Sequence, residues 1–165
     1  MATNTMPSSA LHERETADSK RYLVPLARFC LSLIFLQSIA SHFSPAGVEY
    51  ATRQGVPWAN IAVPISGLIA LVGGISVLLG YRTRVGVALL VLFLIPVTLI
   101  MHRFWNLPDP EMAQMQRIMF LKNVSILGGI LLLGYFGGGP VSVDDVRQRS
   151  HRVPKEQSLP PEDHF

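Results

Sequence analysis

Five polar side chains fall near the ends of otherwise apolar runs in this sequence. They are Gln37, His42, His102, Lys122 and Asn123. A lysine inside a bilayer costs about 2.5 kcal/mol or more, so it usually faces other helices or water. If the apolar runs are membrane spans, all five groups lie at a similar depth near the outer surface. We expect them to line a pocket filled by water or a ligand; the alternative is that each is an ordinary interfacial residue with local partners.

The residue types limit the chemistry of such a pocket. All eleven acidic residues lie outside the apolar runs, so no carboxylate within the membrane can relay a proton or neutralise Arg28 or Lys122. Two histidines without carboxylate or thiolate partners make a weak metal site, and we predict none. No nucleotide-binding loop, nucleophile elbow or CxxC pair is present, so no catalytic residue and no cofactor motif is identified. The single cysteine excludes an internal disulfide.

Arg28 is the other cation inside an apolar run. It lies about seven residues from the inner end of that run, which is roughly 10 Å at the rise of an α-helix. An arginine at this depth can reach the headgroups with its side chain or make structural hydrogen bonds. It could also face an anion or a ligand, and the sequence leaves both interpretations open.

The composition favours a membrane protein. Of the 165 residues, 49% are hydrophobic and only 15% charged, against roughly 25% charged in a typical soluble domain. Four apolar runs are each long enough to cross the roughly 30 Å core of a bilayer as a helix. We therefore predict an all-α polytopic protein whose membrane domain, residues 22–140, is a four-helix bundle. Its spans are about 22–41, 59–81, 84–101 and 117–136.

The segments outside the spans are polar. Residues 42–57 and 106–116 are predicted as loops, the second because it contains a Pro-Asp-Pro turn signal. Residues 1–21 and 141–165 are predicted as disordered cytoplasmic tails.

The positions of Lys and Arg predict the orientation. Nine lie in the two tails and the second loop, and three lie in the first and third loops. Because basic residues stay in the cytoplasm, both termini are expected inside, and Trp58 and Trp105 then both lie at the outer interface. A cleaved signal peptide ending near Ala40 is the competing interpretation of the first run. It would leave three spans and break this agreement.

The net charge of +3 does not indicate a nucleic-acid partner, because the basic residues are not gathered on one amphipathic element. The expected surroundings are a lipid bilayer. The sequence leaves open whether the protein forms a homo-oligomer.

Small residues inside the second and fourth runs predict close helix packing. Three of them recur every four residues in the second run, which gives one smooth face that lets helix backbones approach. The alternative is that glycine and alanine are simply common in membrane helices. The predicted packing residues are Ser66, Ala70, Gly73, Gly74, Gly128 and Gly129.

The order of these motifs resembles the DoxX family of small four-helix proteins of the bacterial inner membrane, over about residues 22–140. The resemblance implies the inner membrane of a bacterium as the location. The matching stretches are Arg28 with 33–36, then 43–47, 67–69, 73–74, 78–84, 102–105, 120–123 and 127–129. The chain departs from that family at His42, where a lysine is common, and at Ala70, where a glutamate is common.

The resemblance implies a function linked to redox chemistry. The family takes its name from a subunit of a thiosulfate:quinone oxidoreductase. It implies a non-catalytic or accessory subunit of a quinone- or thiol-linked membrane system, with a membrane or soluble oxidoreductase as partner and a quinone as a ligand for the pocket. A stand-alone quinone-linked oxidoreductase is the first alternative. A small transporter is the second, although the sequence has no internal repeat.

Overall fold

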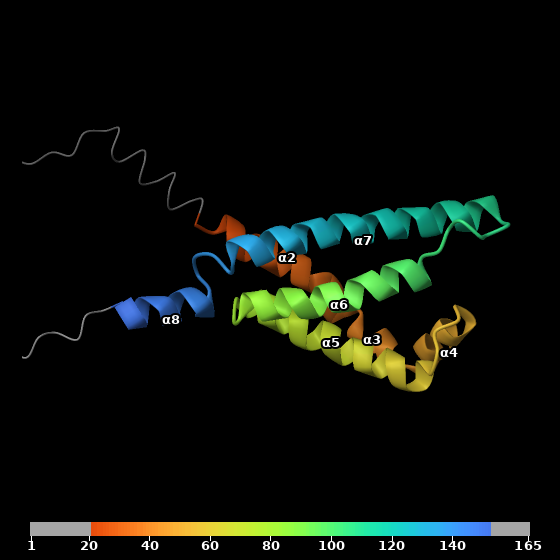
Figure 1. Cartoon of the computed structure of the whole chain (residues 1–165), viewed down its shortest axis with the longest axis horizontal. Coiled ribbons are helices and arrows are strands. Elements are labelled where there is room, and N and C mark those ends of the chain that lie inside the picture. Colours follow the sequence, from red (N-terminus) through yellow and green to blue (C-terminus); the bar gives the residue numbers. More distant parts are fainter. Residues whose placement is uncertain (1–20, 153–165) are drawn as a thin grey trace, which may run out of the picture.

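The chain forms a bundle of long helices in a computed structural model that describes residues 21–152 (Figure 1). The helices are α2 (Leu23–Gln37), α3 (Ile39–His42), α4 (Pro45–Arg53), α5 (Ala59–Leu79), α6 (Thr83–Met101), α7 (Pro110–Phe136) and α8 (Val143–Arg152). No strand occurs within these residues. Four segments are long and apolar enough to cross a membrane: Leu23–His42, α5, α6 and α7. The predicted all-α fold with four membrane-spanning helices is confirmed.

The centre of the bundle is α5, which packs against both α2 and α6, while α7 packs mainly against α6. Val77, Leu90 and Ile130 are fully buried where these helices meet. Large apolar side chains such as Leu33 and Leu132 stay exposed on the outer faces, as lipid-facing surfaces require. The start of α2 and the helix α8 lie at the same end of the bundle (Figure 1), so an even number of spans lies between them.

Two helical segments lie where the sequence predicts loops. Helix α4 occupies nine residues of the predicted loop 42–57, and α7 begins at Pro110 rather than near residue 117. Both start in the same way. The Ser44 hydroxyl accepts a hydrogen bond from the Gly47 N–H, and the Asp109 carboxylate accepts one from the Glu111 N–H. A proline follows each cap, where its missing N–H costs nothing.

Helix α8 lies within the segment 141–165 that the sequence predicts as a disordered tail. The Ser142 hydroxyl accepts a hydrogen bond of 3.0 Å from the Asp145 N–H in its first turn. Residues 1–20 and 153–165, which hold most of the two predicted tails, are outside the described part of the chain.

Candidate ligand-binding site

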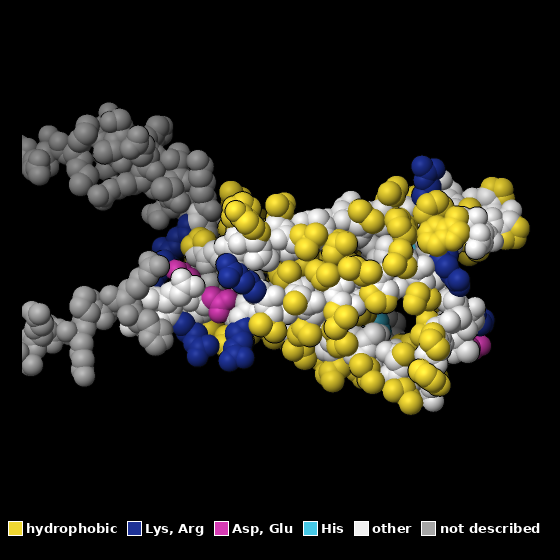
Figure 2. Space-filling model, in the orientation of Figure 1, with side chains coloured by type: hydrophobic (Ala, Val, Ile, Leu, Met, Phe, Trp, Pro, Cys, Tyr) yellow, Lys and Arg dark blue, Asp and Glu magenta, His cyan; other side chains and the backbone are white. Residues whose placement is uncertain are grey.

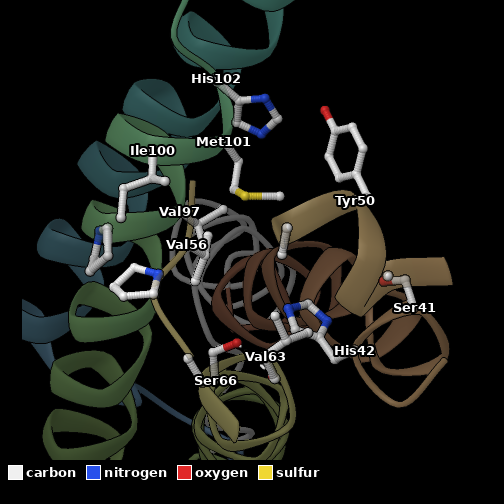
Figure 3. A pocket seen from close by; sticks show the side chains of 15 residues that line it. Ser41, His42, Tyr50, Val56, Val63, Ser66, Val97, Ile100, Met101 and His102 are labelled. Atoms are coloured by element: carbon white, nitrogen blue, oxygen red, sulfur yellow. Dashed lines mark hydrogen bonds between the residues drawn. The ribbon is translucent and has the colours of Figure 1, made fainter. Parts of the chain in front are cut away.

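A cavity of about 470 Å³ opens at the bundle end opposite α8, between α3, α4, α5 and α6. Its walls are mainly apolar, with Val63, Val97 and Met101 among them, and its few polar groups include His42 and His102 (Figure 3). The space-filling view shows the surface hollowed at this end, with histidine atoms visible inside (Figure 2). Such a lining suits the apolar body of a ligand.

A second cavity of about 140 Å³ adjoins the first, between α2, α6 and α7. It shares His42, Val97 and His102 with the large cavity and adds Lys122 and Asn123. Four of the five predicted pocket residues therefore lie around one small cavity. Gln37 does not join them, because its side chain is exposed and lines neither cavity.

His42 is fixed by its neighbours in three directions. Its Nδ1 lies 2.7 Å from the Ser38 carbonyl oxygen, and its ring centroid is 5.5 Å from that of Phe93. A Cβ on Gly67 would come within 2.5 Å of the His42 Cβ, so only glycine lets α3 approach α5 this closely. Because a carbonyl oxygen can only accept, Nδ1 carries a proton and Nε2 is the ring nitrogen left for a ligand.

His102, which directly follows the last residue of α6, is held by a side chain of α7. Its Nδ1 lies 2.9 Å from the Gln116 side-chain oxygen. Sequence reasoning missed Gln116, because it falls in the segment predicted as a loop. The Asp109-Pro110 cap was the signal that could have placed it on a helix.

Asn123 and Lys122 differ although they are adjacent on α7. Asn123 is only 5% exposed and lines the small cavity, so its amide can serve a ligand there. Lys122 is exposed, with Nζ 3.4 Å from the Met119 sulfur. It lies two residues beyond Phe120, whose ring packs 5.6 Å from Phe104 and 6.1 Å from Trp105. Such aromatic groups mark the membrane interface, so the ammonium lies just below it, where the cost of a cation is small.

Arg28 neither reaches the surface nor faces either cavity. It is 2% exposed, and its Nη2 donates a 2.7 Å hydrogen bond to the Val141 carbonyl oxygen. Its Nε and Nη1 are buried without a partner among the described residues. Gly80, at φ +63°, lies directly against the guanidinium. Of the predicted roles, the structure shows structural hydrogen bonding.

Four of the predicted packing residues, Ala70, Gly73, Gly74 and Gly129, lie where helices pack together. A Cβ on Gly73 would meet Leu90 of α6 at 2.8 Å, and one on Gly74 would meet α2 at 3.4 Å, so this part of α5 is in close contact on both sides. Ala70, between them and the cavity, is fully buried. Gly129 lies near Leu31 of α2, 3.5 Å from an added Cβ.

Two of the predicted packing residues have other surroundings. Gly128 faces open space, and Ser66 lines the large cavity while its hydroxyl donates to the Val63 carbonyl oxygen. Close packing occurs instead at Gly67, which the sequence pattern did not single out, because it lies one position away from the predicted four-residue repeat.

The SURF4 family model matches residues 5–150 of this chain, which is most of its length. The chain belongs to the SURF4 family. Its relatives include the inner membrane protein YphA of Escherichia coli, 31% identical over 97 residues that make up 59% of this chain and 69% of YphA. The surfeit locus protein 4 homologue of Schizosaccharomyces pombe is 28% identical over 144 residues, 87% of this chain and 42% of that protein.

A further relative is the inner membrane protein YqjF of Escherichia coli, 28% identical over 123 residues, 73% of this chain and 88% of YqjF. No solved structure matches. The chain thus spans less than half of its fission yeast relative.

Membership of the SURF4 family corrects the resemblance to DoxX proteins. The DoxX interpretation was wrong, and the redox functions implied by it lose their support. The shared motifs were short stretches, rich in Gly, Leu and Phe, both inside the spans and at their ends. Membrane helices in different families use these residues for the same packing and interfacial reasons.

Proposed function

We propose that this SURF4-family protein binds one amphipathic, largely apolar molecule in the outer half of a bacterial inner membrane and acts as a binding protein. The names of YphA and YqjF support the inner membrane as its location. The predicted orientation, with both chain ends in the cytoplasm, puts the cavities on the outer side.

The pair of adjoining cavities is the observation that carries this proposal. About 470 Å³ is within the range of pockets that hold small-molecule ligands. The apolar body of the ligand would fill the large cavity. Its polar head would reach the small one, where Nε2 of His42 or His102 can accept a hydrogen bond and the Asn123 amide can donate one.

A quinone is one member of this ligand class, since it joins a carbonyl-bearing head to an apolar tail. The Asn123 amide and the Lys122 ammonium could donate to such carbonyls. We include quinones among the ligands to be sought, as bound molecules and not as electron carriers.

The test places a bulky side chain in the wall that the two cavities share, so that it fills the space for a ligand. Val97 lines both, and Leu99, two residues along α6, is half exposed and lines neither. Val97→Trp should block binding, and Leu99→Trp should add the same bulk to the lipid-facing side. Each protein would be purified from native membranes in mild detergent, and its bound small molecules would be quantified by mass spectrometry per mole of protein.

We expect one compound to be retained by the wild type and by Leu99→Trp, and to fall about tenfold in Val97→Trp, which corresponds to about 1.4 kcal/mol. Thermal unfolding of both variants would show that the bundle is intact. The proposal is wrong if no compound distinguishes Val97→Trp from the other two proteins.

A further inference from the structure

At the end opposite the cavities, α8 is attached to the turn between α5 and α6 through Asp144. One carboxylate oxygen accepts a 2.8 Å hydrogen bond from the Arg82 N–H, and the other accepts 2.9 Å bonds from the Thr83 N–H and hydroxyl. The Asp144 N–H in turn donates to the Gly80 carbonyl oxygen at 2.9 Å. Four hydrogen bonds thus fix the first turn of α8 against this loop.

This attachment brings a second arginine to the loop. Arg147 lies one turn after Asp144, and its guanidinium carbon is 5.5 Å from the centroid of the Tyr81 ring. The guanidinium carbon of Arg82 is 5.8 Å from the same centroid. Both arginines are exposed. Neither forms an ion pair with another described residue, whereas Arg149 pairs with Asp145 at 2.9 Å. Two guanidinium groups are therefore held on one aromatic ring, and within residues 21–152 neither forms an ion pair with a carboxylate.

The position of Tyr81 places this pair at the depth of lipid headgroups. Tyr81 lies two residues after the end of α5, and span α7 ends in Tyr135 and Phe136, which are 78% and 76% exposed. Aromatic residues at span ends mark the membrane interface. The space-filling view shows Lys and Arg gathered beside this end of the apolar surface (Figure 2).

We propose that Arg82 and Arg147, held on Tyr81, bind the phosphate of an anionic phospholipid of the cytoplasmic leaflet. Guanidinium groups bind phosphate oxygens through paired N–H donors, and the cytoplasmic leaflet supplies anionic headgroups at this depth. Attachment of α8 by Asp144 is what assembles the site from two distant parts of the chain. This site is separate from the cavities, so it does not depend on the function proposed above.

The experiment compares the loss of one arginine inside the proposed site with the loss of one arginine outside it. The full chain is reconstituted in nanodiscs of phosphatidylcholine with a minority of phosphatidylglycerol, and the lipids retained by the released protein are counted by native mass spectrometry. Arg147→Ala should reduce the enrichment of phosphatidylglycerol about fivefold, the factor that matches about 1 kcal/mol for one basic residue at an anionic surface. Arg149→Ala removes the same charge two residues away and should leave the enrichment near that of the wild type.

Asp144→Asn adds a sharper contrast, because it makes the protein more basic while weakening the attachment of α8. A site assembled by α8 predicts less phosphatidylglycerol, whereas general attraction to positive charge predicts more. Limited proteolysis at α8 would verify that the helix is released.

Three results would overturn the proposal. The first is an equal loss of phosphatidylglycerol enrichment in Arg147→Ala and Arg149→Ala. The second is undiminished phosphatidylglycerol enrichment in an Asp144→Asn protein whose α8 is released. The third is displacement of the bound lipid by soluble glycerol phosphate. The last would identify a site for free phosphate compounds.

Discussion

Arg28 donates a hydrogen bond of 2.7 Å to the carbonyl oxygen of Val141, which lies 113 residues later in the chain. The first membrane span is thereby joined to the segment that leads from α7 into α8. A hydrogen bond from a charged donor is worth about 1.5–3 kcal/mol, so this bond adds measurably to the attachment of the segment that the Asp144 hydrogen bonds also provide.

Arg28→Met should therefore loosen residues 137–152 more than it loosens the bundle. We expect the rate of limited proteolysis in this segment to rise about tenfold, because cleavage follows the population of the open form. The control is Arg84→Met, which changes an exposed arginine on the same side of the protein. Equal cleavage of wild type and Arg28→Met would show that the Val141 contact contributes little.

Gly80 and Gly128 should respond to alanine in opposite directions. Gly80 has φ +63°, and a Cβ there would overlap the Arg28 guanidinium and Ser142. Left-handed backbone alone costs a residue with a Cβ about 1–2 kcal/mol, so Gly80→Ala should lower the unfolding temperature markedly. Gly128 meets nothing within 4 Å, and Gly128→Ala should stabilise its helix by about 0.5–1 kcal/mol. Thermal unfolding in detergent would measure both, and a stabilising Gly80→Ala would contradict the geometry.

The contact made by Asp144 should depend on pH. Burial tends to raise the pKa of this carboxyl group, but hydrogen bonds from Thr83 and Arg82 and the charge of Arg147 outweigh it, so the pKa lies below its ordinary 3.8. A carboxyl group whose pKa is lowered by folding adds stability at pH values above the ordinary pKa. That contribution is lost as the pH falls from 3.8 through the lower folded value.

We therefore expect α8 to remain protected from acid-active proteases at mildly acidic pH and to become sensitive below pH 3.8. Asp144→Asn is the control, since it should be sensitive throughout and show no such transition. A wild-type protein whose protection is lost well above pH 3.8 would contradict the assignment to Asp144.

The four spans could be predicted because an apolar run of about 20 residues has few other uses. The two helical segments at the outer end could not be predicted from hydropathy, because their residues are polar or mixed. Ser44-Pro45 and Asp109-Pro110 carried the signal, as cap residues followed by proline at the first helical position. Proline was interpreted there as a turn former, although it is equally suited to start a helix.

The candidate site was predictable only in part, because the sequence indicates how deep a residue lies but not which helices surround it. His42, His102, Lys122 and Asn123 could be grouped by depth, and they lie around the small cavity. The large apolar cavity was not predicted, because one of its walls is α4 and the segment that forms α4 was interpreted as a loop. Nor does depth show direction around a helix, which is why exposed Gln37 was included.

Gly67 offers a last prediction that links packing to the site. An added Cβ would come within 2.5 Å of the His42 Cβ, whereas a Cβ on Gly74 of the same helix would make ordinary contacts at 3.4 Å. Overpacking of this kind costs about 1–3 kcal/mol, so Gly67→Ala should lower the unfolding temperature and displace His42, one of the two histidines that line both cavities. Gly74→Ala should be nearly neutral.

Two measurements would distinguish the effects of Gly67→Ala. Thermal unfolding reports the packing cost, and retention of the bound compound defined with Val97→Trp reports the position of His42. We expect both to change in Gly67→Ala and neither to change in Gly74→Ala. If the unfolding temperature fell while retention stayed at the wild-type level, the contact between α3 and α5 would matter for stability, and His42 would have no part in holding the ligand.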